Sequence, residues 1–195
     1  MKNNLLQRYS HLKTDGFTLV ELMISIAIAA ILMVIALPNF NSFLVDTRVD
    51  NEISQLQRLL LTARNTAINA EQSVTICPLN ASNLCDTNWH NEISVFIDID
   101  RDKVYEPISD ERIIIVKGAI DSNDKLQYGQ DSIIYTPTGN ISGGVSASPF
   151  KYCPKNYDTK SRGITVSSSG RSYVTSDTDN DNIDEDRSGS EITCT

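Results

Sequence analysis

The sequence predicts an α+β protein in which a long amino-terminal helix packs against a β-rich globular head. The first indication is an apolar run over residues 17–37. The second is a helical recurrence of apolar residues over 39–70, and the third is a change beyond residue 70 to short β-branched segments. The expected parts are a leader peptide at 1–16, a transmembrane helix or stem at 17–38, an amphipathic half of the same helix at 39–70, and a head at 71–195.

The composition excludes some classes of function. The 195 residues carry a formal net charge of -8, which argues against a protein held on nucleic acid by its overall charge. Neither a G-x-S-x-G motif nor a glycine loop for phosphate is present, and the two histidines, His11 and His90, suggest no catalytic group. We therefore expect a protein that is not an enzyme.

The amino-terminal apolar run is best explained as a membrane span. Its 21 residues would cross a hydrocarbon core of about 30 Å as a helix, and Pro38 then marks a kink or a local break. A secretory signal peptide is the first alternative, but Ala36-Leu37-Pro38 offers no convincing cleavage site. A buried core helix is the second, although the run is long and uniform for one. Basic residues precede the span, which predicts a single pass with a cytoplasmic amino terminus.

Glu21 is unusual because it lies inside this apolar run. A carboxylate in lipid is expensive, so a partner is expected, yet the span itself contains no cation. An amino group at the start of a neighbouring subunit's helix would provide one.

The segment Gly16-Phe17-Thr18-Leu19-Val20-Glu21 resembles the prepilin cleavage motif of type IV pilins and type II secretion pseudopilins. The resemblance implies that a prepilin peptidase cuts between Gly16 and Phe17 and methylates the new amine of Phe17. It also implies that Glu21 pairs with the amine of an adjacent subunit. The head would then be periplasmic, on a chain anchored in the bacterial inner membrane until it enters an extracytoplasmic filament.

Beyond the span, the sequence predicts one amphipathic helix and seven strands. The apolar stripe of the helix consists of Val49, Ile53, Leu56, Leu60, Ala63 and Ala67. The expected strands are 73–77, 93–99, 112–117, 125–128, 133–136, 163–167 and 171–175. Two longer connections, 78–92 and 137–162, are expected to be loops.

The four cysteines favour two disulfides in an oxidising compartment, since neither pair shows the C-x-x-C spacing of metal or redox motifs. We expect Cys77–Cys85 and Cys153–Cys194, although four cysteines allow three pairings.

Further motifs resemble the GspH/FimT group of minor pilins and pseudopilins. They are Ala63–Ile68, Cys77, Cys85, Trp89, Tyr135–Gly139, Cys153 and Ile164–Val166 leading to Gly170-Arg171. The resemblance implies a subunit that helps to initiate or cap a type IV pilus, with a type II secretion pseudopilus as the alternative. The cysteine pairs favour the pilus-associated side.

A DNA-binding role is a further alternative that the resemblance raises. Some FimT-type pilins bind DNA through a G-R-x-R motif, and here Gly170-Arg171-Ser172-Tyr173 lacks the second arginine. Arg171 is nevertheless a candidate, because basic residues and tyrosines interleave around it in a manner suited to single-stranded DNA. They are Lys151, Tyr152, Lys155, Tyr157, Lys160, Arg162 and Tyr173.

Acidic residues at alternate positions near the carboxyl terminus suggest a cation site. Asp177, Asp179, Asp181 and Asp184 resemble the short D-x-D-x-D loops that bind calcium, although a solvated acidic loop would look the same. A second run, Asp98 to Asp102 with Glu106, is a weaker candidate because Arg101 and Lys103 dilute its charge. No cofactor is required by the predicted assembly role, and calcium is the one candidate.

Overall fold

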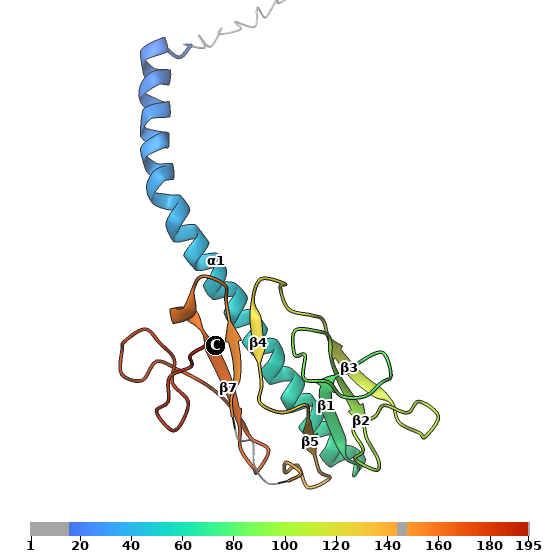
Figure 1. The fold of residues 1–195 in the computed structure, drawn as a ribbon. Coiled ribbons are helices and arrows are strands. Elements are labelled where there is room, and N and C mark those ends of the chain that lie inside the picture. Colours follow the sequence, from blue (N-terminus) through green and yellow to red (C-terminus); the bar gives the residue numbers. More distant parts are fainter. Residues whose placement is uncertain (1–15, 144–147, 195) are drawn as a thin grey trace, which may run out of the picture. The chain divides into compact units, whose positions relative to one another are not determined.

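The computed structural model describes residues 16–143 and 148–194 (Figure 1). Within these ranges the elements are α1 (Leu19–Ala70), β1 (Val74–Pro78), β2 (Ile93–Ile97), β3 (Ile113–Lys117), β4 (Lys125–Gln127), β5 (Ile133–Tyr135), β6 (Phe150–Cys153), the 3-10 helix η1 (Asp158–Lys160), β7 (Arg162–Val166) and β8 (Ser172–Val174). A long helix followed by a β-rich region confirms the predicted α+β class.

The chain divides into two compact units, residues 1–42 and Phe43–Thr195, and the boundary falls within α1. We call residues Leu19–Ser42 the stem half of α1 and residues Phe43–Ala70 its head half. The backbone is helical without interruption from Leu19 to Ala70, so no break occurs at Pro38. The side chains of residues 37–39 lie outside those that the structure describes.

The head half of α1 buries the apolar stripe that its sequence predicts. All six predicted stripe residues are at most 3% exposed, and Val45 and Leu59 join them. Recurrence at three and four positions places these side chains on one face of the helix, where they contact both sheets. The helix ends at Ala70, and Glu71 then adopts a left-handed φ of 55°, the conformation that commonly terminates helices.

The first sheet has the strand order β3-β2-β1-β5, and all its pairs are antiparallel. Every residue of the central strands β1 and β2 is buried, because the sheet is covered on both faces. Residues such as Val74 and Val95 pack in the main core with α1. On the other face, Phe96 packs in a small second core with the Cys77–Cys85 pair.

The second sheet has the order β4-β6-β7-β8, also antiparallel throughout. Its strand β6 lies inside the segment 137–162, so the prediction of a loop there was wrong for residues Phe150–Cys153. Phe150 and Tyr152 point into the core, the alternation typical of a strand. Pro149 and Pro154 flank this short alternation and hid it from the sequence pattern.

An aromatic cluster in the main core joins the two sheets. Trp89, from the connection after β1, makes edge contacts with Tyr128 beyond β4 and with Phe150 of β6 at centroid distances of 5.2 and 5.0 Å. Its indole nitrogen donates to the carbonyl of Gln130 at 2.8 Å, so burial leaves no unmatched donor. A single core therefore joins both sheets to the head half of α1. In Figure 1, β1, β4 and β7 lie over this half of the helix.

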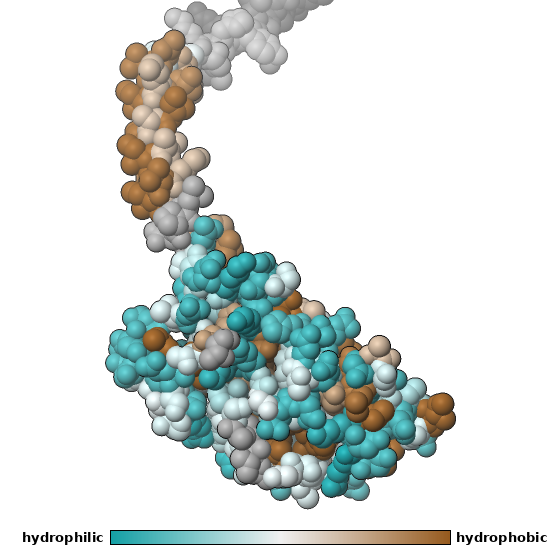
Figure 2. All heavy atoms as spheres, viewed as in Figure 1, coloured by the Kyte–Doolittle hydropathy of each residue, from teal (hydrophilic) through white to brown (hydrophobic). Residues whose placement is uncertain are grey.

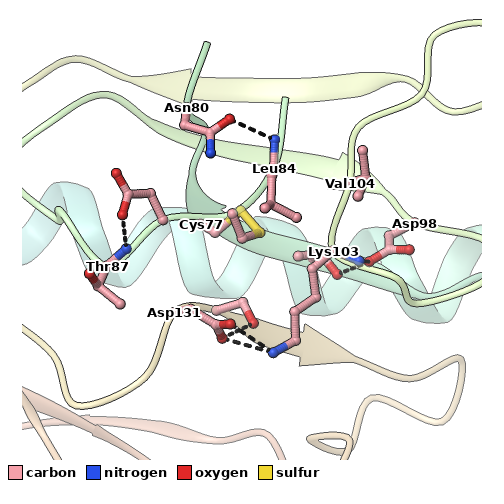
Figure 3. Close-up of a disulfide and its surroundings, with 12 residues drawn as sticks. Cys77, Asn80, Leu84, Thr87, Asp98, Lys103, Val104 and Asp131 are labelled. Atoms are coloured by element: carbon pink, nitrogen blue, oxygen red, sulfur yellow. Dashed lines mark hydrogen bonds and ion pairs between the residues drawn. A yellow bond between two sulfur atoms is a disulfide. The ribbon is translucent and has the colours of Figure 1, made fainter. Parts of the chain in front are cut away.

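Both predicted disulfides are present, Cys77–Cys85 and Cys153–Cys194. The first fastens the connection 79–92 to β1, and Figure 3 shows its surroundings. The second fastens the carboxyl-terminal segment to the end of β6, across a sequence separation of 41. Each closes a segment that has little regular structure of its own, which restricts the unfolded chain and so stabilises the fold.

Candidate functional site

The predicted processing junction lies just before α1. Gly16 and Phe17 precede the helix, and Phe17 is 87% exposed. Thr18 caps the helix: its hydroxyl accepts from the Glu21 amide at 3.2 Å, and the Glu21 carboxylate accepts from the Thr18 amide at 3.3 Å. This reciprocal pair is a capping box, which satisfies amides that the first turn leaves without intrahelical partners. Glu21 thus has a role within its own helix that the sequence interpretation missed, although Thr18-x-x-Glu21 is its sequence signal.

The stem half of α1 exposes apolar side chains around its circumference. Ile24, Ile26, Leu32 and Val34 lie on different sides of the helix, and each is more than half exposed. Figure 2 shows this surface as hydrophobic, whereas the surface of the other unit is mostly hydrophilic. Within the described residues α1 is the one helix long and apolar enough to cross a membrane. An apolar surface of this size requires cover by lipid or by other protein.

The head half of α1 carries ion pairs to the strands and loops that surround it. The ammonium group of Lys117 lies 2.6 Å from the Glu52 carboxylate, and both side chains are largely buried. Arg48 pairs with the buried Asp124 at 2.8 Å. These contacts fix the helix in the globular unit in addition to the apolar stripe.

Several of the residues that suggested DNA binding are engaged by other parts of the globular unit. Lys160 pairs with Asp46 at 2.5 Å, and Arg162 pairs with Asp50, so acids of α1 neutralise both. Tyr152 is buried in the core and donates its hydroxyl to Asp124 at 2.6 Å, which removes it as a stacking platform. Arg171 is exposed at the turn between β7 and β8. Two of the five candidate cations are therefore paired with acids, and one of the three tyrosines is unavailable for stacking.

The carboxyl-terminal acidic run forms a loop closed at its base by a backbone pair between Ser176 and Glu185. Carboxylate oxygens of Asp177, Asp179, Asp181 and Glu185 all lie within 4.8 Å of one another. Desolvation within the loop, together with the charges of Asp181 and Glu185, raises the pKa of Asp179. Three of the four predicted ligands are thus brought together.

Asp184, the fourth predicted ligand, is not part of that group. Its carboxylate accepts from the Thr175 hydroxyl at 2.9 Å and faces the Arg162 guanidinium at 3.6 Å. Neighbouring residues of an extended segment point to opposite sides, and hence Glu185 faces the cluster when Asp184 faces β7. Sequence reasoning missed Glu185, although this alternation was the signal that would have found it.

A second acidic group lies on the connection from β2 to β3. Oxygens of Asp98, Asp100 and Glu111 are within 4.8 Å of one another. Glu111, rather than the expected Glu106, completes the group. The Glu106 amide donates to the Glu111 carboxylate at 2.8 Å, whereas the Glu106 carboxylate accepts from the Ser109 hydroxyl at 2.9 Å. Burial raises the pKa of both Asp98 and Glu111. Lys103 does not neutralise this group, because its ammonium pairs with Asp131 at 2.9 Å (Figure 3).

Comparison with known families identifies the chain. The family model described as Type II transport protein GspH matches residues 52–170, which is more than half of the sequence. The chain belongs to the GspH family. A second model, the prokaryotic N-terminal methylation motif, matches residues 12–37 and so includes Gly16, Phe17 and Glu21. The predicted family is therefore confirmed.

Individual relatives agree with the family. Two fimbrial proteins of Pseudomonas aeruginosa are each 35% identical to this GspH-family chain over 60 residues, 31% of its length. The match spans only 39% of the length of these curated relatives. The crystal structure of the type IV minor pilin FimU of Pseudomonas aeruginosa superposes with a TM-score of 0.52 at 14% identity, covering 67% of this chain and 90% of FimU. At that identity the likeness shows a shared fold.

Proposed function

We propose that this chain is a minor pilin or pseudopilin that a prepilin peptidase processes and that then assembles into a type IV pilus, as an initiating or tip component. Cleavage falls between Gly16 and Phe17, and the new amine of Phe17 is methylated. The role is structural and involves no catalysis. The observation that carries the proposal is a helix whose stem half is apolar and exposed on all sides and begins at this methylation motif.

Physical chemistry supports two successive environments for the stem half. Moving a large apolar side chain from water into lipid or protein contributes about 1.5–3 kcal/mol, so the exposed side chains of this segment favour either environment strongly. Lipid tails and packed apolar side chains are similar solvents for such a surface. A stem held in the inner membrane can therefore pass into a bundle of neighbouring stems without a large loss of apolar burial.

Glu21 is the residue for which a filament bundle and lipid differ as environments, because a neighbouring stem can supply a cation and lipid tails cannot. Its carboxylate is held near the amino end of its own helix by Thr18, where the helix dipole also favours a negative charge. Processing creates an amine at Phe17 of every subunit. Pairing of Glu21 with the amine of a neighbour would neutralise both charges in an apolar interior and fix the axial register of the two stems.

The proposed topology is a single pass with a cytoplasmic amino terminus and a periplasmic globular unit. Two disulfides support an oxidising compartment for that unit. The basic residues Lys2, Arg8 and Lys13 support a cytoplasmic leader by the positive-inside rule.

A pilus is favoured over a secretion pseudopilus because the curated relatives are fimbrial proteins, although the family model is named for type II transport. A DNA-uptake role is less well supported, since the acids of α1 already pair with two of the basic residues that would serve it.

The structure suggests a pair of variants that separates the two roles of Glu21. Glu21→Gln keeps a side chain that can complete the capping box but removes the charge. Thr18→Ala removes the capping hydroxyl but keeps the carboxylate. We expect both variants to be cleaved and methylated, as measured by mass spectrometry of the mature amino terminus. Incorporation into sheared filaments, measured by immunoblot, should fall strongly for Glu21→Gln and little for Thr18→Ala.

If incorporation fell strongly for Thr18→Ala and little for Glu21→Gln, Glu21 would act in helix capping rather than in setting the axial register of the stems. Normal incorporation of Glu21→Gln would overturn the pairing of Glu21 with a neighbour's amine. Absence of cleavage in the wild-type chain, in cells that contain a prepilin peptidase, would overturn the proposal as a whole.

A further inference from the structure

Two loops that are far apart in the sequence share one backbone design. One contains Asp98, Asp100 and Asp102, and the other contains Asp177, Asp179 and Asp181. In each loop the residues that follow the second and third aspartates are left-handed, with φ between 65° and 71°; they are Arg101, Lys103, Asn180 and Asn182. This conformation is rare for residues other than glycine, so its fourfold occurrence reflects a demand of the loops themselves.

The hydrogen bonds of the two loops also correspond. The first aspartate accepts from the amide five positions on, Lys103 to Asp98 at 3.3 Å and Asn182 to Asp177 at 3.0 Å. The third aspartate accepts from the amide two positions on, at 2.8 Å in both loops. The first loop brings together the carboxylates of Asp98 and Asp100 but not that of Asp102, and the second brings together all three of its aspartates. Both resemble the first half of an oxygen-rich calcium loop.

Loops of this kind are common without an ion, but the carboxyl-terminal loop also contains a buried carboxylate oxygen of Glu185 that has no partner among the described residues. The residue is 6% exposed, and its Oε2 accepts from the amide and hydroxyl of Thr178 at 2.7 and 2.6 Å. Its buried Oε1 has no hydrogen-bond partner within residues 16–143 and 148–194. A buried carboxylate oxygen without a partner destabilises the fold. Here the oxygen belongs to Glu185, whose carboxylate lies close to those of three aspartates.

Asp98 of the other loop likewise has a buried carboxylate oxygen without a partner among the described residues. The residue is fully buried, and its Oδ2 accepts from the Thr75 hydroxyl at 2.6 Å. Its Oδ1 has no partner in the part of the chain that the structure describes. Glu111, 5% exposed, and the exposed Asp100 bring further carboxylate oxygens to the same place. No ion pair joins a lysine or arginine to any of these three acids among the described residues.

The spacing of the oxygens fits one cation in particular. Calcium binds oxygens at about 2.3–2.6 Å, so two ligands on opposite sides of the ion are about 4.6–5.2 Å apart. The oxygens in each group lie within 4.8 Å of one another, which allows a single ion to contact all of them. Magnesium requires shorter distances in a stricter octahedral arrangement and retains water, and it is a poorer fit to loops that supply carboxylates alone.

We propose that the globular unit binds two calcium ions, one at Asp177, Asp179, Asp181 and Glu185 and the other at Asp98, Asp100 and Glu111. The first ion holds the loop 177–184 against the backbone pair at its base, close to the segment that Cys194 fastens. The second ties the end of β2 to the start of β3. Both ions stabilise connections that carry little other regular structure.

The test is a calcium titration of the full chain in a non-ionic detergent after removal of metal with EDTA. Isothermal titration calorimetry should give two sites with Kd of about 10⁻⁴–10⁻³ M, the range of extracellular calcium modules. At a calcium concentration tenfold above Kd, each site should raise the folding equilibrium constant about elevenfold, which appears as a higher Tm. Magnesium should have a much smaller effect.

Exposed aspartates give variants that remain folded. Asp179→Asn should remove the carboxyl-terminal site and Asp100→Asn the other, each leaving one site. The double variant should bind no calcium. Asp158→Asn, which removes an exposed carboxylate outside both groups, is the matched control and should keep both sites. Far-ultraviolet circular dichroism of each variant checks that the fold is retained.

Several outcomes would overturn the proposal. These are the absence of heat and of a Tm shift at about 10 mM calcium, ten times the weakest expected Kd, and an equal response to magnesium. Retention of both sites in the double variant would do the same. If only one of the two single variants lost a site, the location that this variant tests would be supported and the other location would be overturned. Binding depends on the folded globular unit, so a negative result leaves the assembly proposal intact.

Discussion

The stem half and the head half of α1 are parts of one uninterrupted helix, yet their surfaces are covered in different ways. In the stem half apolar side chains are exposed on every side. In the head half one stripe is buried by the two sheets, and charged side chains on the remaining surface pair with neighbouring elements. Helical propensity alone does not account for this contrast, because both halves form the same backbone structure.

The difference indicates where each half finds its partner. The head half finds its partners within the chain, since its apolar stripe is buried and four of its six charged side chains form ion pairs in the same globular unit. The stem half has neither kind of partner among the described residues of its own unit, apart from the capping pair of Thr18 and Glu21. Its partners are therefore external, first lipid and then the stems of other subunits in the proposed function.

The strongest test of this contrast is to remove one charge that anchors the head half. Lys117→Met leaves the Glu52 carboxylate, 17% exposed, without its cation. Breaking a buried ion pair in this way costs about 3–5 kcal/mol. We expect a corresponding fall in the free energy of unfolding in urea. Fluorescence of Trp89, the single and fully buried tryptophan, reports on the globular unit alone.

A double variant provides the control. Lys117→Met combined with Glu52→Leu removes both charges and should recover most of the loss, because an apolar pair of similar volume is often as stable as the buried ion pair. If the single variant were as stable as the wild type, the ion pair would contribute nothing to holding the helix, and the contrast would rest on apolar packing alone.

The sequence predicted those features that depend on local periodicity. Recurrence at three and four positions identified the stripe from Val49 to Ala67, and alternation of β-branched residues identified seven strands near their observed positions. The sequence pattern missed β6, because its alternation is only four residues long, lies between two prolines and cannot be distinguished from a loop. Local pattern is thus a good guide to element type and a poor guide to short strands between prolines.

The candidate sites depended more on tertiary structure. The alternate aspartates of the loop 177–184 were visible in the sequence. Whether Asp184 or Glu185 joins them depends on which of the two side chains points toward the loop, and the backbone pair at the base of the loop decides this. Glu111 lies thirteen positions after Asp98 and shows no spacing signal at all. The pairing of Lys160 and Arg162 with acids more than 100 residues earlier was equally invisible in the sequence, and it engages two of the candidate cations.

The apolar contrast is tested by the same substitution in each half. Leu60→Ala, at a fully buried position of the stripe, should lower the free energy of unfolding of the globular unit by about 2–5 kcal/mol through lost burial and a residual cavity. Leu32→Ala, at a position that is 61% exposed, should leave that free energy unchanged. Both are measured by Trp89 fluorescence in detergent. A similar loss for both would mean that the stem half supports the globular unit, contrary to the division described above.

The smallest expected effect concerns the exposed acid beside Arg48. Hydrogen bonds from the amide and side chain of Asn123 lower the pKa of Asp121, with a smaller contribution from the Arg48 charge. A carboxyl group whose pKa is lower in the folded chain binds fewer protons there than in the unfolded chain. Its contribution to stability is therefore complete above the unfolded pKa of about 3.9 and is lost as the pH falls through the folded pKa.

Asp121→Asn should accordingly reduce the fall in Tm between neutral and strongly acidic pH by a small amount, because the variant has no carboxyl group to protonate at this position. Asp158→Asn removes an exposed carboxylate elsewhere on the globular unit and controls for the change in net charge. Equal pH dependence in the two variants would show that neither the Asn123 hydrogen bonds nor the Arg48 charge at Asp121 adds to the stability of the globular unit. The buried Asp124 would then account for the ionic contact of Arg48 by itself.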